Sequence, residues 1–325
     1  MKKILCCDFG GTLVKSSIRY ENGDVLSSST DVSPTLSKQS YIDFLLHLYQ
    51  QNKEVDGIAL SMPGVIDSKI GTLITSGTYV HLVGMNVKRE FEKLIPIRIE
   101  VENDGCCAVL AEHWKGNLQD ADNGVAVILG TGIAGGIIIN GKLYKGSHLS
   151  AGDFSTLLLG EHNDFSSIAL MKCGISTMVF EASRRLGVDL KKNPNYPLYS
   201  LFLDCEQMLS DMDHRFPNGF DGYAFFELLN EGNEICEEIY SAFLDALVRL
   251  IFNIGKMFDP QKICLGGGVM AQERIMTDVM KKMNSITDFG NGLIDLNFTV
   301  ERCRFTNDSN QLGALYHFLN MGDKV

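Results

Sequence analysis

The feature that most constrains the fold is a strand, a glycine turn and a hairpin that follow one another twice along the chain. The copies are 3–9, Gly10-Gly11, 12–19 and 25–32, and then 124–130, Thr131-Gly132, 134–139 and 142–145. Simple doubly wound domains send a helix out of the first turn. The hairpins therefore favour an internally duplicated α/β fold. The alternative is a single α/β sheet that contains three glycine turns.

Helices and further strands are expected in the rest of each half. The hydrophobic spacing predicts helices at 33–52, 87–94, 104–114, 234–257, 270–283 and 308–320. It predicts strands at 55–62, 97–102, 262–267 and 296–305. The first helix is expected to begin at Ser33-Pro34-Thr35, and the segment 152–230 is expected to contain several helices.

The composition narrows the class of protein. The 325 residues are enough for two compact domains, and 45% hydrophobic with 21% charged residues is typical of a globular protein. A formal net charge of −11 argues against nucleic acid and anionic membranes as partners. No signal peptide and no apolar run of about 20 residues is expected. Nine cysteines without a C-x-x-C pair indicate reduced thiols and a cytoplasmic protein.

The first glycine turn, Asp8-Phe9-Gly10-Gly11-Thr12, suits a nucleotide phosphate. Glycines let a phosphate approach the backbone N–H groups, and the Thr12 hydroxyl can donate to a phosphate oxygen. Asp8 at the strand end can hold Mg²⁺ through water. Taken alone, this turn is explained equally well as a tight hairpin with Asp8 as its cap.

Two further turns repeat this chemistry. Gly130-Thr131-Gly132 ends a strand in the second half, and Gly266-Gly267-Gly268 is expected to join a strand directly to a helix. The third turn can admit a phosphate or an adenine ring, although close strand–helix packing would also explain it. None of the turns matches G-x-x-x-x-G-K-[ST] or a complete G-x-G-x-x-G, so P-loop and dinucleotide-binding folds are disfavoured.

A carboxylate stands where the strand 97–102 ends and a helix begins, at Asn103-Asp104. An Asp in this place is a normal helix cap, but ligands of α/β sheets bind at the carboxyl ends of strands. An Asp is also the usual acceptor of the proton that a hydroxyl loses when it attacks the γ-phosphate of ATP. Asp104 is therefore the predicted general base, and Asn103 can hold sugar hydroxyls.

Five segments in this order resemble the ROK family (repressor, open reading frame, kinase) of the actin/hexokinase-like ATPases, over nearly the whole chain. They are DFGGT (8–12), SMPGVID (61–67), VENDGCCAVLAEHWKG (101–116), the stretch 129–154 and ICLGGGV (263–269). The resemblance implies a duplicated actin-like (ribonuclease H-like) α/β fold with two domains around a cleft, 1–118 plus 306–325 and 119–305. It also implies ATP and Mg²⁺ as cofactors, phosphates between the turns at 10–12 and 130–132, and a homodimer.

The resemblance further implies a sugar near Gly64, Asn103, Asp104 and Asp153. The family's usual A-G-E-x-G-H reads Ala151-Gly152-Asp153-Phe154-Ser155-Thr156 here, so Asp153 keeps a carboxylate and Thr156 replaces a histidine. Of the family's zinc motif only Cys173-Gly174 remains, and no structural zinc is expected. This pattern is similar to the zinc-less β-glucoside kinases and some N-acetylmannosamine kinases.

These observations predict a cytoplasmic kinase that transfers phosphate from ATP to a sugar hydroxyl, the 6-OH of a hexose, a hexosamine or a β-glucoside. One alternative is a non-catalytic sugar sensor, which the altered segment 153–156 favours. Another is a structural actin-like ATPase, which would have no need of Asn103-Asp104. The sequence leaves the identity of the sugar open, and it leaves the roles of His81 and His162 open as well.

Overall fold

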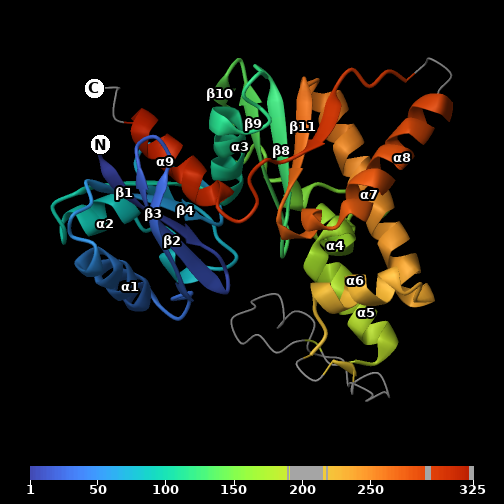
Figure 1. Ribbon diagram of the computed structural model, residues 1–325, viewed down its shortest axis with the longest axis horizontal. Helices are drawn as coiled ribbons and strands as arrows, with labels where there is room; N and C mark the ends of the chain where they lie inside the picture. Colours follow the sequence, from blue (N-terminus) through green and yellow to red (C-terminus); the bar gives the residue numbers. More distant parts are fainter. Residues whose placement is uncertain (189, 191–214, 217–218, 290–293, 322–325) are drawn as a thin grey trace.

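The computed structural model describes residues 1–188, 190, 215–216, 219–289 and 294–321, and it contains two five-stranded sheets (Figure 1). The strand orders are β3-β2-β1-β4-β7 and β10-β9-β8-β11-β12. In each sheet the two hairpin pairs are antiparallel and the two remaining pairs are parallel. The shared order and directions confirm the predicted duplication and the actin-like α/β fold.

The strands lie close to their predicted positions. The first sheet contains β1 (Lys3–Phe9), β2 (Leu13–Tyr20), β3 (Val25–Val32), β4 (Gly57–Met62) and β7 (Arg98–Asn103). The second contains β8 (Gly124–Leu129), β9 (Ile133–Ile139), β10 (Lys142–Leu143), β11 (Lys262–Gly266) and β12 (Thr299–Arg302). A small ribbon of β5 (Ile66–Asp67) and β6 (Thr72–Leu73) follows β4.

Helices pack against both sheets and form two main hydrophobic cores (Figure 1). The helices are α1 (Lys38–Gln51), α2 (Val87–Glu92), α3 (Asp104–Lys115), α4 (Ala169–Cys173), α5 (Ile175–Leu186), α6 (Gly222–Asn230), α7 (Glu234–Phe258), α8 (Glu273–Phe289) and α9 (Ser309–Met321). Helices α4 to α6 confirm that 152–230 contains helices, while 191–214 lies outside the described residues. In the described part of the chain no helix combines the length and apolarity needed to cross a membrane.

Helices α3 and α9 lie side by side between the two sheets (Figure 1). Cys107 of α3 packs with Leu315 of α9 and with apolar side chains of the first sheet. Val109, on the other side of α3, packs with Ala126 and Ile138 of the second sheet. The first turn of α3, which carries Asn103-Asp104, is consequently at the boundary between the two halves.

Glycines permit this close packing. A side chain at Gly105 of α3 would place its Cβ 2.3 Å from the carbonyl oxygen of Gly135 in β9. A Cβ at Gly136 would meet the carbonyl oxygen of Gly105 at 2.7 Å, and one at Gly313 of α9 would meet that of Cys107 at 1.7 Å. Gly136 therefore serves the packing of α3 on β9, whereas a Cβ at Gly135 would meet the ring of Phe154 at 2.3 Å.

Two predicted helix starts are wrong. Helix α1 begins at Lys38 because Ser37 caps it and forms a capping box with Ser40. Ser33 instead donates its hydroxyl to the Gly10 carbonyl at 2.7 Å and supports the first glycine turn. The third glycine turn continues into a single 3₁₀ turn, Gly268–Ala271, and α8 begins only at Glu273.

A buried carboxylate supports the place where the chain returns from β12 towards α9. Glu112 of α3 is 0% exposed and accepts hydrogen bonds from the backbone N–H groups of Asn117 at 2.8 Å, Arg304 at 3.1 Å and Phe305 at 2.9 Å. One side chain thus accepts from backbone N–H groups both in the segment after α3 and in the segment between β12 and α9.

We predict that Glu112→Ala lowers the free energy of unfolding by at least about 3 kcal/mol, because three backbone N–H groups lose the carboxylate that accepts their hydrogen bonds. Urea denaturation followed by circular dichroism measures this loss. Glu92→Ala, at an exposed position of α2, serves as the control and should change stability by less than about 0.5 kcal/mol. Equal stability of the two variants would contradict the assigned role of Glu112.

Candidate active site

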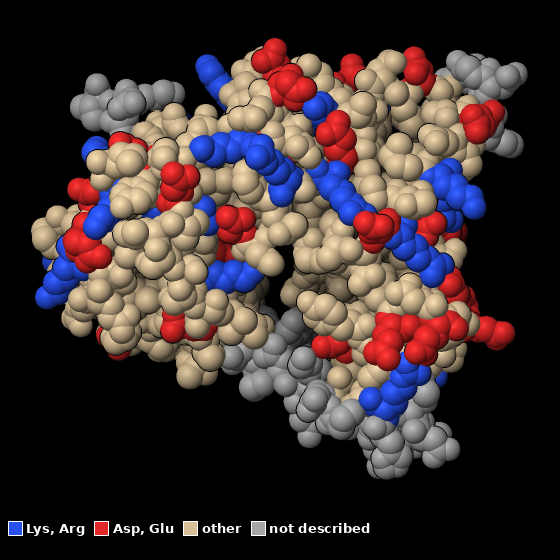
Figure 2. Space-filling model, viewed as in Figure 1, with Lys and Arg blue, Asp and Glu red and all other residues tan. Residues whose placement is uncertain are grey.

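The surface is hollowed between the two halves (Figure 2), and a cavity of about 340 Å³ lies where they meet. Its lining comes from 63–65, 75–77, 103–104, 106, 133–135, 149–153 and 155. This volume is within the range of about 300–1,000 Å³ that is usual for small-ligand sites. Four predicted sugar-site residues line it, namely Gly64, Asn103, Asp104 and Asp153. Thr156 is not part of the lining.

Asn103 fixes the start of α3. Its Oδ1 accepts from the backbone N–H of Cys106 at 2.9 Å, so Asn103 is the helix cap and Asp104 is the first residue of the helix. The alternative interpretation of Asp104 as the cap is therefore wrong. The Asn103 amide nitrogen donates to the Gly64 carbonyl and to Asp104 Oδ1, both at 2.9 Å. These two bonds use both protons of the amide, which makes Asn103 a support for its neighbour.

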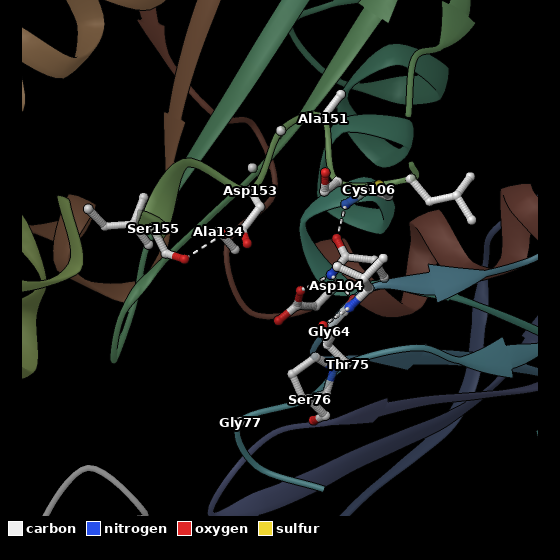
Figure 3. A pocket seen from close by; sticks show the side chains of 18 residues that line it. Gly64, Thr75, Ser76, Gly77, Asp104, Cys106, Ala134, Ala151, Asp153 and Ser155 are labelled. Carbon is white, nitrogen blue, oxygen red and sulfur yellow. Dashed lines mark hydrogen bonds between the residues drawn. The ribbon is translucent and has the colours of Figure 1, made fainter. Parts of the chain in front are cut away.

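Asp104 is directed into the open space between the two sides of the cavity (Figure 3). Its Oδ1 accepts from the Gly105 N–H at 2.8 Å in addition to the Asn103 amide. Burial, and secondarily the negative charge of Asp8, raise the pKa of Asp104 to about 7. A carboxyl group with a pKa near neutrality is well matched to proton transfer at physiological pH.

Asp8 stands at the end of β1, beside the first glycine turn. Its Oδ1 accepts from the Ser61 hydroxyl at 2.9 Å and from the Asn310 amide at 3.0 Å. Burial raises the pKa of Asp8, and these neutral donors together with Lys15 oppose the rise only in part. A buried carboxylate held mainly by neutral groups fits a bound cation, as predicted for Mg²⁺.

Backbone contacts shape the three glycine turns. The Gly10 carbonyl accepts from Ser33 and, at 3.0 Å, from the Tyr79 hydroxyl. Gly267 has a positive φ of 96°, and a Cβ there would lie 2.0 Å from the Leu129 carbonyl oxygen. The second and third turns are therefore in contact. A Cβ at Gly130 or Gly268 would meet nothing within 4 Å, so both backbones face open space that a ligand can enter.

The segment 149–155 forms the second-half side of the cavity. The Ser155 hydroxyl donates to Asp153 Oδ1 at 2.5 Å, and the Thr156 hydroxyl donates to the Asp153 carbonyl at 3.4 Å. Ser155 therefore orients the carboxylate that the sequence predicted. The Asp-x-Ser spacing, which favours such a local bond, is the signal that could have identified it.

Several contributors were missed because they are distant in sequence from the motifs. Asn310 comes from α9 and reaches Asp8. Thr75 and Ser76 follow β6 and line the cavity opposite Asp153 (Figure 3). His81 and His162 are not in the lining. Cys173 is buried in the core of the second half, and the described residues contain no cluster of His, Cys, Asp or Glu able to hold a metal.

The chain belongs to the ROK family, whose model matches residues 4–175 and 205–320. A beta-glucoside kinase from Listeria monocytogenes is 28% identical over 98% of this chain and 97% of its own. A beta-glucoside kinase from Klebsiella pneumoniae is 25% identical over 97% and 96%. A ROK family glucokinase from Streptomyces griseus, solved with glucose and AMPPNP, gives a TM-score of 0.75 at 20% identity over 96% of this chain and 98% of that one. The family model and the two beta-glucoside kinases confirm the predicted resemblance. The glucokinase structure confirms the fold.

Leu149 has a backbone conformation that leucine rarely adopts. Its φ is +65°. It lies in a loop between Lys145 and Ala151, and the Ala151 N–H donates to the Lys145 carbonyl at 3.1 Å. The left-handed conformation costs a non-glycine residue about 1–2 kcal/mol. Leu149 also lines the cavity, so this strain is located at the candidate site.

We predict that Leu149→Gly raises the free energy of unfolding by about 0.5–1 kcal/mol, because relief of the strain exceeds the entropic cost of glycine. Leu149→Ala keeps the Cβ and hence the strain, so it should not stabilise the protein. Thermal unfolding of the two variants measures the difference. If Leu149→Gly is less stable than wild type, the contacts of the leucine side chain contribute more to the free energy of unfolding than the backbone strain costs.

Proposed function

We propose that this protein is an ATP-dependent sugar kinase in which Asp104 is the general base. The observation that carries the proposal is the Asp104 carboxylate on the first turn of α3, directed into the cavity with a pKa of about 7. A sugar hydroxyl there gives its proton to Asp104 while its oxygen bonds to the γ-phosphorus. The bond from phosphorus to the β–γ bridging oxygen breaks, and ADP leaves.

The proposed acceptor is the 6-OH of a hexose unit, and a β-glucoside is the first candidate. Two relatives that match nearly the whole chain are beta-glucoside kinases, which supports this choice. Asp153 would accept hydrogen bonds from sugar hydroxyls, oriented by Ser155. Asn103 would act mainly by holding Asp104 and Gly64 in place, and Thr156 by supporting the Asp153 backbone.

The proposed phosphate donor is ATP. Its phosphates would lie between Gly10-Gly11-Thr12 and Gly130-Thr131-Gly132, with Gly266-Gly267-Gly268 on the nucleotide side. The open space at Gly130 and Gly268 supports this placement. Mg²⁺, when bound, would neutralise phosphate charge, and Asp8 would hold it through water. We also infer the division into 1–118 plus 306–325 and 119–305, and a homodimer that works in the cytoplasm.

We predict that Asp104→Asn lowers kcat by about 10²–10⁴-fold, because the amide cannot take the proton. The assay couples ADP release to a panel of glucose, N-acetylmannosamine, N-acetylglucosamine, fructose, mannose, cellobiose and gentiobiose. ATP binding, measured by calorimetry, should be unchanged and serves as the control for folding. If no sugar is phosphorylated although ATP binds, the protein is a sugar sensor and Asp104 is not a base.

The pH dependence follows from the raised pKa of Asp104. Only the carboxylate accepts a proton, so kcat/KM for the sugar should fall about tenfold per unit below pH 7 and level off above it. Steady-state measurement of kcat/KM from pH 5 to 9 gives this fall on the acidic side of the profile (the acidic limb). A profile that stays flat down to pH 5 would contradict a base with this pKa.

A further inference from the structure

We infer that Lys145 is a positioning residue for the proposed kinase reaction, and that its ammonium group ties together three segments that line the sugar cavity. Lys145 follows β10 in the second half of the chain and is not itself part of the cavity lining. The inference rests on the proposed function, but its structural core concerns contacts that exist whatever the substrate is.

The Lys145 ammonium makes three short hydrogen bonds to the first half of the molecule. Nζ donates to the Ile66 carbonyl at 2.8 Å, to the Ser68 hydroxyl at 2.7 Å and to Glu102 Oε1 at 2.6 Å. An ammonium has three protons, so its donor capacity is fully used. The Ser68 hydroxyl in turn donates to Glu102 Oε2 at 2.7 Å, which closes the network.

Each partner adjoins a segment of the cavity wall. Ile66 and Ser68 follow Gly64-Val65, and Glu102 precedes Asn103-Asp104. Lys145 itself precedes the segment 149–155, and its carbonyl accepts from the Ala151 N–H. Glu102 Oε1 also accepts from the Asn103 backbone N–H at 2.7 Å. The position of Asp104 is therefore linked through Glu102 and Lys145 to the segment that carries Asp153.

Stability alone explains this network poorly. The side chains of Lys145 and Glu102 are only 14% and 1% exposed. Removing two charges from water costs several kcal/mol per ion, and an apolar pair of similar volume is often at least as stable. A buried ion pair that spans two halves of the chain is better explained by the geometry that it imposes.

Lys145 is also the charge partner of Glu102. In the described chain no other lysine or arginine lies within ion-pair distance of this carboxylate. His317 Nδ1 lies 3.8 Å from Glu102 Oε2, but burial lowers the pKa of His317 and so favours its neutral form. Glu100, Lys88 and Lys145 also act on the pKa of His317. The thiols of Cys106 and Cys107 face Glu102 and Asp104, and Asp8 acts on Cys107. Without Lys145, an uncompensated negative charge would remain two residues from the base.

The first test compares Lys145→Met, which keeps the apolar stem, with Lys145→Arg and with Lys142→Met. Lys142 is exposed on β10 and serves as the matched control. Lys145→Met should lower kcat by about 10- to 100-fold, the usual effect of a misplaced reacting group. The KM for ATP should change little, Lys145→Arg should recover part of kcat, and Lys142→Met should match wild type.

The second readout separates positioning from a merely structural role. In Lys145→Met the acidic limb of the pH profile should move to higher pH, because the unpaired Glu102 charge disfavours ionisation of Asp104. In the double variant Lys145→Met/Glu102→Gln the limb should return towards the wild-type position. A loss of kcat that is equal at every pH, with no return in the double variant, would overturn the inference.

Hydrogen exchange by mass spectrometry tests the contacts without requiring turnover. Lys145→Met should increase exchange in 63–68, 102–106 and 145–155, while 129–132 should remain as in wild type. If wild type phosphorylates no sugar, the proposed function fails, and the exchange pattern alone then decides whether Lys145 ties the segments. Exchange identical to that of Lys142→Met would overturn the inference in either case.

Discussion

Gly105 at the start of α3 lies so close to the backbone of β9 that neither Gly105 nor Gly136 has room for a side chain. This contact places the first turn of a first-half helix directly on a second-half strand. As a result Asn103 and Asp104 lie at the boundary between the two halves of the chain, where they line the cavity. The same helix packs on α9, where a Cβ at Gly313 would meet the Cys107 carbonyl oxygen, so a second glycine-dependent contact joins the last helix to α3.

Around this contact the molecule buries several carboxylates, and their partners differ in kind. Glu112 accepts hydrogen bonds from backbone N–H groups and stabilises the segment between β12 and α9. Glu102 pairs with the Lys145 ammonium and accepts from the Ser68 hydroxyl, so it joins the segments before Asp104, after Gly64 and before Leu149. Asp8 and Asp104 receive mainly neutral donors, and burial raises the pKa of each. Carboxylates that are not neutralised by a firm ion pair remain available to a cation or to a proton.

Much of the site was predictable because its residues lie at strand ends. Gly64 follows β4, Asn103 ends β7 and Asp104 comes directly after it, and parallel strands bring their carboxyl ends to the same edge of a sheet. Ser76, Asn310 and Lys145 were not predictable in this way. They reach the site from a ribbon loop, from the last helix and from the second half, and no local pattern encodes those encounters.

The sequence by itself determined the duplicated α/β fold and the ROK family membership, and it predicted roles for Asp8, Asp104 and Asp153. These depend on strand–turn–hairpin patterns and on motifs that are local in the chain. The tertiary structure alone decided which glycines serve packing, since Gly136 and Gly130 look alike in sequence, but a Cβ at Gly136 would meet α3 and one at Gly130 would meet nothing within 4 Å. It alone decided that Asn103, not Asp104, caps α3, and that Lys145 crosses to Glu102. Such assignments depend on distances between segments far apart in the chain, which only packing sets.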